Sequence, residues 1–286
     1  MKVIRAGVLG FCMGVRRAYE MARRESGLKG RRVYTLGPLI HNPSVLEDLG
    51  ERGVSILEPG GIPGVLENST VIIRAHGVSP AVERELALKG LSVLDATCPH
   101  VKASQNKVRD LSRLGFTVFL AGEKDHGEIV GIRGYIEGPC FVIANPLEAE
   151  AAATELARDN PGAKTALVAQ TTLSQEEYFA IGEAIKRRFP ELEMVNTICG
   201  ATGERQDALR ELSAHVDGFV ISGGRESANT RRLLSIAEGC GKKAWLVENA
   251  SGIPDELSSC SVIGLAAGAS TPDSVIDAIE QKLLSL

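Results

Sequence analysis

Short apolar runs alternate along the whole chain with longer segments of mixed polarity. Residues 117–121 and 165–169 are mostly apolar runs of a length typical of strands buried on both faces. The segment 100–114, by contrast, carries its apolar residues at helical spacing. Because strands that alternate with helices form βαβ units, the pattern predicts an α/β fold with parallel sheets. The predicted strands are residues 3–9, 33–36, 54–57, 70–73, 91–94, 117–121, 141–144, 165–169, 194–198, 219–221, 244–247 and 262–266, with a Gly/Pro loop over 59–64.

Three of these strands lead into a cysteine that opens a helix-like segment. A cysteine at a helix N-terminus faces unpaired N–H groups and the positive end of the helix dipole, which favour its thiolate form. We therefore interpret these cysteines as metal ligands rather than as small core residues. They are Cys12, Cys98 and Cys199.

Polar residues follow the later strands at nearly repeated distances from these cysteines. The regularity indicates an internal repeat of three units, in which insertions fall in the connecting loops. His41, His126 and Ser227 form a first set, 29, 28 and 28 residues after the preceding cysteine, and His76, Thr171 and Ser270 form a second, 64, 73 and 71 residues after it.

The repeat divides the chain into three small α/β units. We predict these units at residues 13–97, 98–198 and 199–286, with the N-terminal strand in residues 1–12 completing the third. Ligands of parallel sheets collect beyond the carboxyl ends of the strands, where all the polar residues above lie. The sequence therefore predicts three pseudo-threefold-related units with parallel sheets, arranged as a closed ring around one central site.

The composition narrows the class of protein. With 44% hydrophobic residues, the 286-residue chain can bury a large core. The net charge of −4 gives no reason to expect nucleic acid or an anionic membrane as a partner. No apolar run approaches the ~18 residues of a membrane span, and no signal-peptide core precedes Arg16. We expect a cytoplasmic protein whose cysteines stay reduced.

Three thiolates at one site leave one metal position open. Zinc could take the three cysteines and a histidine, but structural zinc sites usually draw on short Cys-x2–4-Cys pairs, which this sequence lacks. An iron–sulfur cube suits widely separated cysteines better, since three irons take thiolates and the fourth has no protein ligand. The sequence therefore favours a central iron–sulfur site with an iron open to substrate.

The polar residues around this site suit a small phosphate ester. They supply imidazoles, hydroxyls, an amide and loop N–H groups, all of which can donate hydrogen bonds to an anion. Glu128 is the one carboxylate among them, and a single acid amid donors is the natural proton source. The donors are His41, His76, His126, Thr171, Ser227, Asn229 and Ser270.

The segments that carry these residues form a recognisable set of motifs. They are GFCMGV (10–15), HN (41–42), AHGVS (75–79), DATCP (95–99), QTTLS (170–174), NTIC (196–199) and AGAS (267–270). Together they resemble the 4-hydroxy-3-methylbut-2-enyl diphosphate reductase family, in the same order and over essentially the whole chain. The chain departs from that pattern at Gly127, where proline is common, at Ala228, where some members have serine, and at Gly200, where a larger residue often stands.

The resemblance implies the last step of the methylerythritol phosphate route to isoprenoids. Two electrons and two protons would remove the allylic hydroxyl of the substrate, giving isopentenyl and dimethylallyl diphosphates. A ferredoxin- or flavodoxin-type protein would donate the electrons.

The resemblance also assigns roles to the residues. Cys12, Cys98 and Cys199 would hold a [4Fe–4S] cluster whose open iron binds the substrate hydroxyl. In the catalytic group, which includes His126, Glu128 would supply protons and Thr171 would orient the hydroxyl. The substrate-binding residues would be His41, His76, His126, Thr171, Ser227, Asn229 and Ser270.

Two functions from other classes stay open on the residues alone. One is a zinc-dependent hydrolase or lyase that acts on a small phosphate ester. The other is a non-catalytic iron–sulfur sensor, although the polar residues outnumber what a sensor needs. Cys140, Cys240 and Cys260 lack the strand-to-helix junction and are expected to pack as small apolar residues.

Overall fold

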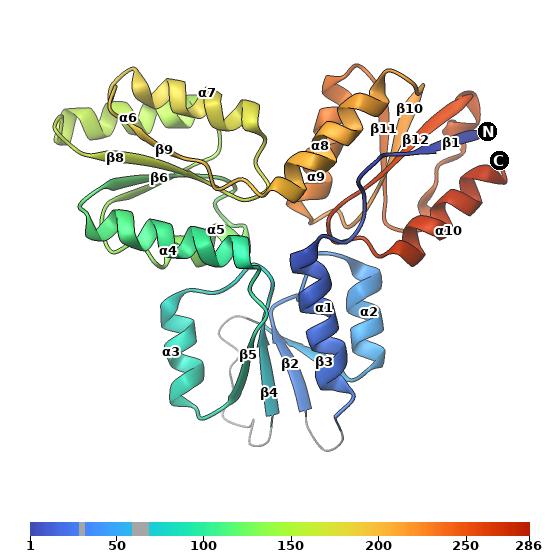
Figure 1. Ribbon diagram of the computed structural model, residues 1–286, viewed down its shortest axis with the longest axis horizontal. Helices are drawn as coiled ribbons and strands as arrows, with labels where there is room; N and C mark the ends of the chain where they lie inside the picture. The colour runs from blue at the N-terminus through green and yellow to red at the C-terminus, as the bar shows by residue number, and fades with distance from the viewer. Residues whose placement is uncertain (29–31, 59–68) are drawn as a thin grey trace. The chain divides into compact units, whose positions relative to one another are not determined.

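A computed structural model describes residues 1–28, 32–58 and 69–286, and the loop predicted over 59–64 lies outside these residues. Strands and helices alternate along the described chain (Figure 1). Their order is β1 (Lys2–Arg5), α1 (Met13–Ser26), β2 (Arg32–Leu36), α2 (Pro43–Glu51), β3 (Val54–Leu57), β4 (Ser69–Ile73), α3 (Pro80–Leu88), β5 (Ser92–Asp95), α4 (Pro99–Arg113), β6 (Thr117–Ala121), α5 (Gly127–Arg133), β7 (Cys140–Ile143), α6 (Pro146–Asp159), β8 (Thr165–Ala169), α7 (Gln175–Lys186), β9 (Glu193–Val195), α8 (Gly200–Ser213), β10 (Gly218–Ser222), α9 (Ala228–Gly239), β11 (Lys243–Val247), the 3-10 turns η1 (Ala250–Gly252) and η2 (Asp255–Ser259), β12 (Val262–Ala267) and α10 (Asp273–Leu284).

The described strands form three four-stranded sheets. Their orders are β3-β2-β4-β5, β7-β6-β8-β9 and β1-β12-β10-β11. The register of β1 on β12 is parallel, with Lys2 opposite Val262 and Arg5 opposite Leu265. The α/β class with parallel sheets is therefore confirmed, and the first strand of the chain completes the last sheet.

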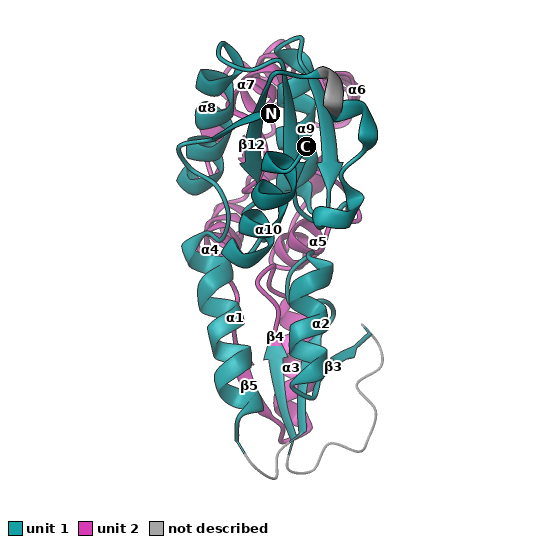
Figure 2. Ribbon diagram, turned by 90° about the vertical axis from the view of Figure 1, so that its right-hand side faces the viewer, with its two compact units in different colours: residues 1–72, 200–286 teal, residues 73–199 magenta. Residues whose placement is uncertain are grey.

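The chain divides into two compact units, coloured separately in Figure 2. Unit 1 comprises residues 1–72 and 200–286, and unit 2 comprises residues 73–199. The boundaries of the three repeated units and their arrangement as a closed ring stay predictions. Among the described helices, none is both long and apolar enough to span a bilayer.

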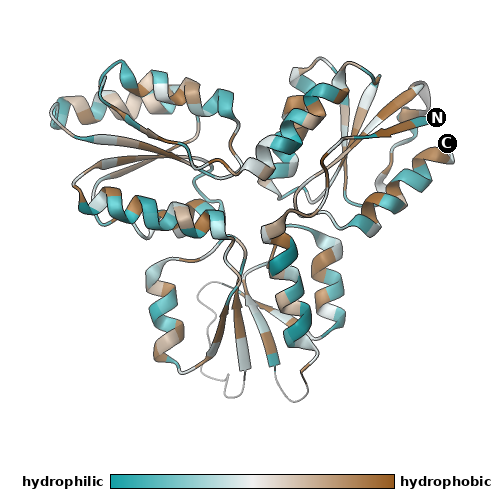
Figure 3. Cartoon of the chain, viewed as in Figure 1, coloured by the Kyte–Doolittle hydropathy of each residue, from teal (hydrophilic) through white to brown (hydrophobic). Residues whose placement is uncertain are grey.

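In unit 2 the sheet β7-β6-β8-β9 is covered by helices on both faces. Phe119 and Leu167 face the apolar residues of α6 and α7, whereas Leu120 and Val168 face those of α4 and α5. Successive strand residues point to opposite faces, so β6 and β8 are buried along their whole length and appear hydrophobic in Figure 3. Only the ends of these strands are left for polar chemistry.

Unit 1 contains a sheet built in the same way. Phe219 and Ile221 of β10 pack against α8 and α9, and Val220 packs with Ile276 and Ile279 of α10 on the opposite face. The carboxyl ends of β10 and β12 lead into the turns before Ser227 and Ser270. The core therefore fixes the strands, and the strands fix the turns that carry the predicted site residues.

Two strands are shorter than predicted. The sequence predicts a strand over residues 3–9, but β1 ends at Arg5 and the chain leaves the sheet after Ala6, because Gly7 and Gly10 weaken extended structure and Gly10 turns with φ of +77°. The strand predicted over 194–198 ends at Val195. There the Thr197 hydroxyl contacts both the N–H and the carbonyl of Ala169 and takes the place of ladder bonds.

Candidate functional site

The three predicted metal-binding cysteines all lie where a helix begins. Cys12 and Cys98 are the N-cap residues of α1 and α4, and Cys199 directly precedes α8. All three are partly buried and none is in a disulfide. The three cysteines therefore lie at the helix starts that the sequence predicts for them, and their role as metal ligands stays a prediction.

Each cysteine is tied by its backbone to one of the polar turns. The N–H of Cys12 donates to Ala269 O (3.1 Å), the N–H of Cys98 to Ala75 O (2.9 Å), and the N–H of Cys199 to Thr171 O (2.9 Å). Those carbonyls lie immediately before Ser270, immediately before His76, and in Thr171 itself. One backbone hydrogen bond is therefore made three times, two residues beyond the end of β12, β4 and β8, and Thr171 stands one position earlier relative to it than His76 and Ser270 do.

In unit 1 the predicted anion-binding residues lie on turns at the ends of β10 and β12. The Ser227 hydroxyl accepts the Thr230 N–H (3.3 Å) as the N-cap of α9, so its own proton is available to donate. The Ser270 hydroxyl donates to the backbone carbonyl of His41 (3.3 Å). A side chain at Gly224 would lie 3.1 Å from the carbonyl carbon of His41, so the two turns are in close contact.

Asn229 has the clearest mark of a binding residue in unit 1. The residue is only 4% exposed, yet neither its amide nitrogen nor its amide oxygen has a hydrogen-bond partner among the described residues. A buried amide without partners costs free energy, which is recovered when a ligand supplies them. The adjacent Ala228 has no polar side-chain atom and carries no side-chain role.

Unit 2 contains the predicted acid and the hydroxyl together. Glu128 in α5 accepts two hydrogen bonds from Thr171, from the backbone N–H at 2.6 Å and from the hydroxyl at 2.8 Å. The carbonyl of Thr171 accepts the N–H of Cys199. The acid, the hydroxyl and a metal-binding cysteine are therefore linked through one residue at the end of β8.

Burial changes the acidity of Glu128. The side chain is 2% exposed, and this loss of water raises its pKa to about 7, although the two bonds from Thr171 favour the carboxylate and oppose the shift. A group with a pKa near neutrality can both donate and accept a proton under ordinary conditions. This is the acidity that a proton source needs.

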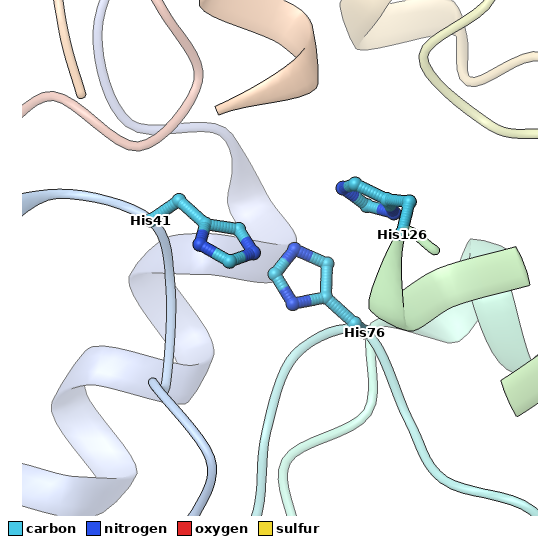
Figure 4. Close-up of side chains that lie close together, drawn as sticks. All are labelled: His41, His76 and His126. Atoms are coloured by element: carbon cyan, nitrogen blue, oxygen red, sulfur yellow. The ribbon is translucent and has the colours of Figure 1, made fainter. Parts of the chain in front are cut away.

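The two histidines of unit 2 contact each other. The rings of His76 and His126 meet edge to face, with centroids 5.1 Å apart and planes at 83° (Figure 4). His126 is the N-cap of α5, and its Nδ1 accepts the N–H of Glu128 (3.2 Å). Neutral His126 therefore carries its proton on Nε2, the nitrogen that can donate to an anion.

The predicted residues fall in both units, and each group is brought together within its unit. Unit 1 holds Cys12, His41, Ser227, Asn229 and Ser270, and unit 2 holds His76, Cys98, His126, Glu128, Thr171 and Cys199. Cys140 and Cys260 pack against apolar clusters, and burial raises the pKa of the Cys140 thiol to about 11, as fits a packing role.

Sequence reasoning missed two supporting residues. Arg205 is 4% exposed and donates to the carbonyl of Gly10 through Nε (3.2 Å) and Nη2 (2.7 Å), which fixes the turn before Cys12. Arg74 lies beside Gly127. The proximity of Arg74 to His76 in the sequence was a signal that could have been used, whereas nothing near Arg205 in the sequence indicates its long-range contact.

Comparison with known proteins gives a consistent result. Residues 3–284 match the family model described as LytB protein. A 4-hydroxy-3-methylbut-2-enyl diphosphate reductase from Treponema denticola is 46% identical over 290 residues, covering 99% of both chains. One with the same name from Caldanaerobacter subterraneus subsp. tengcongensis is 39% identical over 289 residues, covering 100% of this chain and 98% of the relative.

Two solved structures are also similar. The E-1-hydroxy-2-methyl-but-2-enyl-4-diphosphate reductase from Plasmodium falciparum matches with a TM-score of 0.89 at 26% identity, over 98% of this chain and 87% of that one. A structure described as (E)-4-hydroxy-3-methyl-but-2-enyl diphosphate reductase, the terminal enzyme of the non-mevalonate pathway, matches with a TM-score of 0.70 at 36% identity, over 100% of both chains.

Proposed function

The chain belongs to the LytB protein family, and on this premise we propose that it reduces its substrate with a [4Fe–4S] cluster held by Cys12, Cys98 and Cys199. It is an oxidoreductase with the activity of its relatives, the reduction of 4-hydroxy-3-methylbut-2-enyl diphosphate. Such an enzyme requires a small diphosphate substrate and a redox partner. The zinc hydrolase or lyase that the residues alone left open finds no support among the relatives.

The reaction removes the allylic hydroxyl of the substrate. Two electrons and two protons break the C–O bond: one proton leaves with the oxygen as water, and the other joins the carbon skeleton. The products are isopentenyl and dimethylallyl diphosphates, depending on which carbon is protonated. The protein must therefore hold a diphosphate, deliver electrons and provide a proton close to the hydroxyl.

The cysteines suit the proposed cluster. All three are partly buried, lie at the start of a helix and are in no disulfide. When bound, a cluster with three protein thiolates supplies electrons and leaves one iron open to substrate. The backbone N–H of each cysteine donates to a carbonyl of a polar turn, and this bond holds the cysteine beside that turn within the same unit.

Proton delivery is assigned to the Glu128–Thr171 pair. The Thr171 hydroxyl donates to Glu128, so its oxygen lone pairs are available to accept a hydrogen bond from the substrate hydroxyl. When Glu128 is protonated this bond reverses: the carboxyl proton is donated to the Thr171 hydroxyl oxygen, and the Thr171 hydroxyl proton passes to the departing oxygen. The pKa of Glu128, about 7, makes both protonation states accessible. This pair, buried and joined to Cys199 through Thr171, is the observation that carries the proposal.

The diphosphate is assigned to hydrogen-bond donors other than lysine and arginine. Asn229 offers a buried amide without partners among the described residues, Ser227 has a hydroxyl proton left after capping α9, and His126 would donate through Nε2 because its Nδ1 accepts the Glu128 N–H. His41, His76 and Ser270 complete this set. Because these donors include no lysine or arginine, binding depends on hydrogen bonds rather than on flexible cations.

An anaerobic spectrum tests the proposal most directly. The protein is purified without oxygen, assayed for iron and acid-labile sulfide, and its electronic absorption and EPR spectra are recorded before and after the allylic diphosphate is added. We expect an iron–sulfur spectrum that changes with the substrate, because one iron is open. A colourless protein that contains one zinc ion and no iron would contradict the proposed cluster.

The nature of the electron donor is a separate proposal. We assign a ferredoxin- or flavodoxin-type protein, by resemblance to the family. The test compares turnover with a reduced ferredoxin, with a reduced flavodoxin and with dithionite plus a viologen dye. Turnover with dithionite and the dye, but with neither the ferredoxin nor the flavodoxin, would contradict this assignment of the electron donor. The reductase activity itself would still be supported.

A further inference from the structure

Three glycines occupy one face of the short helix α5 and its C-cap. Gly127, Gly131 and Gly134 are four and three residues apart, a spacing that puts them on the same side of a helix. None of the three has a positive φ, so the backbone conformation does not require glycine at these positions. Close approach of another segment is the remaining reason for glycine at all three.

That segment is the turn that carries His76. A Cβ on Gly131 would lie 3.5 Å from the carbonyl oxygen of His76 and from the carbonyl carbon of Gly77, and one on Gly134 would lie 3.2 Å from the Cα of Ser79. Both segments belong to unit 2. The glycine face of α5 therefore lies directly along residues 76–79.

Arg74 completes this contact at the N-terminal end of α5. A Cβ on Gly127 would lie 2.7 Å from Cζ of Arg74 and 3.2 Å from its Nη1. The guanidinium thus fills the space that a side chain at 127 would need. Gly127 stands between His126 and Glu128, and Arg74 stands two residues before His76, where its carbonyl accepts the Gly77 N–H (3.0 Å).

We propose that Arg74 is a positioning residue whose guanidinium, packed on Gly127, holds the His126 turn against the His76 turn so that both imidazoles bind one diphosphate. The proposal rests on the proposed function, since it assumes that these histidines hold the anion. It assigns Arg74 no direct contact with the ligand. The planar guanidinium matters here by its shape, which a lysine lacks.

The proposal predicts a specific pattern among four variants. Arg74→Ala leaves a space beside the His126 turn, and Gly127→Ala forces the guanidinium out of it, so each weakens diphosphate binding by about tenfold. In the double variant the new methyl group occupies part of the vacated space. It should bind more tightly than either single variant, and Arg74→Lys should behave like Arg74→Ala.

The test measures the affinity of the anaerobic holoenzyme for inorganic diphosphate by calorimetry, together with KM and kcat for the allylic diphosphate. We expect the loss to fall mainly on the affinity and on KM, with kcat changed less. Gly203→Ala is the matched control, because a Cβ there meets nothing within 4 Å and α8 gains an ordinary helix residue. The thermal midpoint of each variant shows whether weaker binding comes from a displaced turn in a folded protein or from loss of the fold.

The outcomes distinguish this proposal from the proposed function. Wild-type protein that neither binds inorganic diphosphate nor turns over the substrate counts against the function itself. Wild-type binding with unchanged variants overturns the role of Arg74. Loss in Arg74→Ala and equal loss in the double variant, with normal binding by Gly127→Ala and Arg74→Lys, would mean that Arg74 contacts the anion by its charge, and would also overturn it.

Discussion

The site residues of unit 1 and those of unit 2 differ in that only unit 2 contains a buried carboxyl group among them. Unit 1 contributes Ser227 and Asn229, neutral donors that do not titrate near pH 7, together with His41 and with Ser270, whose hydroxyl donates to the His41 carbonyl. In unit 2 the buried Glu128 has a pKa raised to about 7, and it is linked to His126 and Thr171 by hydrogen bonds. The difference indicates that proton transfer is the task of unit 2, whereas both units contribute residues that we propose hold the anion.

The largest effect should come from a cysteine, because the proposed reduction depends on the proposed cluster. Cys98→Ser should lower the iron and sulfide content sharply and reduce turnover by more than about a thousandfold, since a hydroxyl is a poor ligand to these irons. Cys240→Ser, at the C-cap of α9, is the control and should keep the full cluster content. Normal turnover by Cys98→Ser would contradict the proposed role of Cys98 as a ligand of the cluster.

Glu128→Gln sharpens the comparison by removing the titrating group while keeping its shape. We expect kcat to fall by roughly 100- to 10,000-fold, the range for loss of a general acid, with little change in diphosphate affinity. The pH profile of kcat should also lose the ionisation near pH 7 that Glu128 gives the wild type. A variant with normal kcat would show that the proton comes from another group.

The same substitution should change how stability depends on pH. The pKa of Glu128 is about 7 in the fold and 4.5 in the unfolded chain, so the folded state binds more protons between these values and stability falls as pH rises from about 4.5 to 7. The loss amounts to about 3 kcal/mol above pH 7. Urea unfolding at pH 4.5 and pH 8 should show that the free energy of unfolding of Glu128→Gln, relative to that of the wild type, rises by about this amount between the two pH values. Parallel pH curves for the two proteins would contradict the raised pKa.

Asn229→Leu tests how much a neutral donor of unit 1 contributes to binding the diphosphate. We expect KM for the diphosphate to rise by roughly 10- to 100-fold, because each lost hydrogen bond to a charged group contributes about 1.5–3 kcal/mol. Stability should stay the same or rise, since the variant removes a buried amide without partners among the described residues. The measurements are steady-state kinetics and the thermal midpoint. A fall in stability with normal KM would make Asn229 a structural residue.

Ser227→Ala should have the smallest effect. It removes one hydroxyl with two roles, which are to cap α9 and to donate a hydrogen bond to the anion. Loss of the cap to Thr230 N–H should cost about 1 kcal/mol of stability, and loss of the donor should raise KM a few-fold at every pH. Ser174→Ala is a suitable control, because Ser174 caps α7 by the same bond to Glu177 N–H (3.2 Å) and lies outside the predicted binding set. It should lose similar stability and leave KM unchanged.

Much of the fold could be predicted because strands, helix starts and their polar ends are local features of sequence. The strands over 117–121 and 165–169 were predicted with their observed limits, and the cysteines lie at helix starts as expected. Of the two strands that are shorter than predicted, β1 ends early because of the nearby Gly7 and Gly10, whereas β9 ends early because of a distant partner. The Thr197 hydroxyl ends β9 early by bonding to Ala169, which lies 28 residues away.

The sequence by itself determined which residue types stand at the strand ends, the spacing that repeats them after each cysteine, and the alternation that specifies parallel sheets. Only the tertiary structure decided that Glu128 is buried on Thr171, that Asn229 has no partners among the described residues, and that Arg74 packs on Gly127. The reason is that hydrogen-bonding propensity and periodicity depend on neighbours in the chain, whereas burial, proton affinity and close contact depend on neighbours in space.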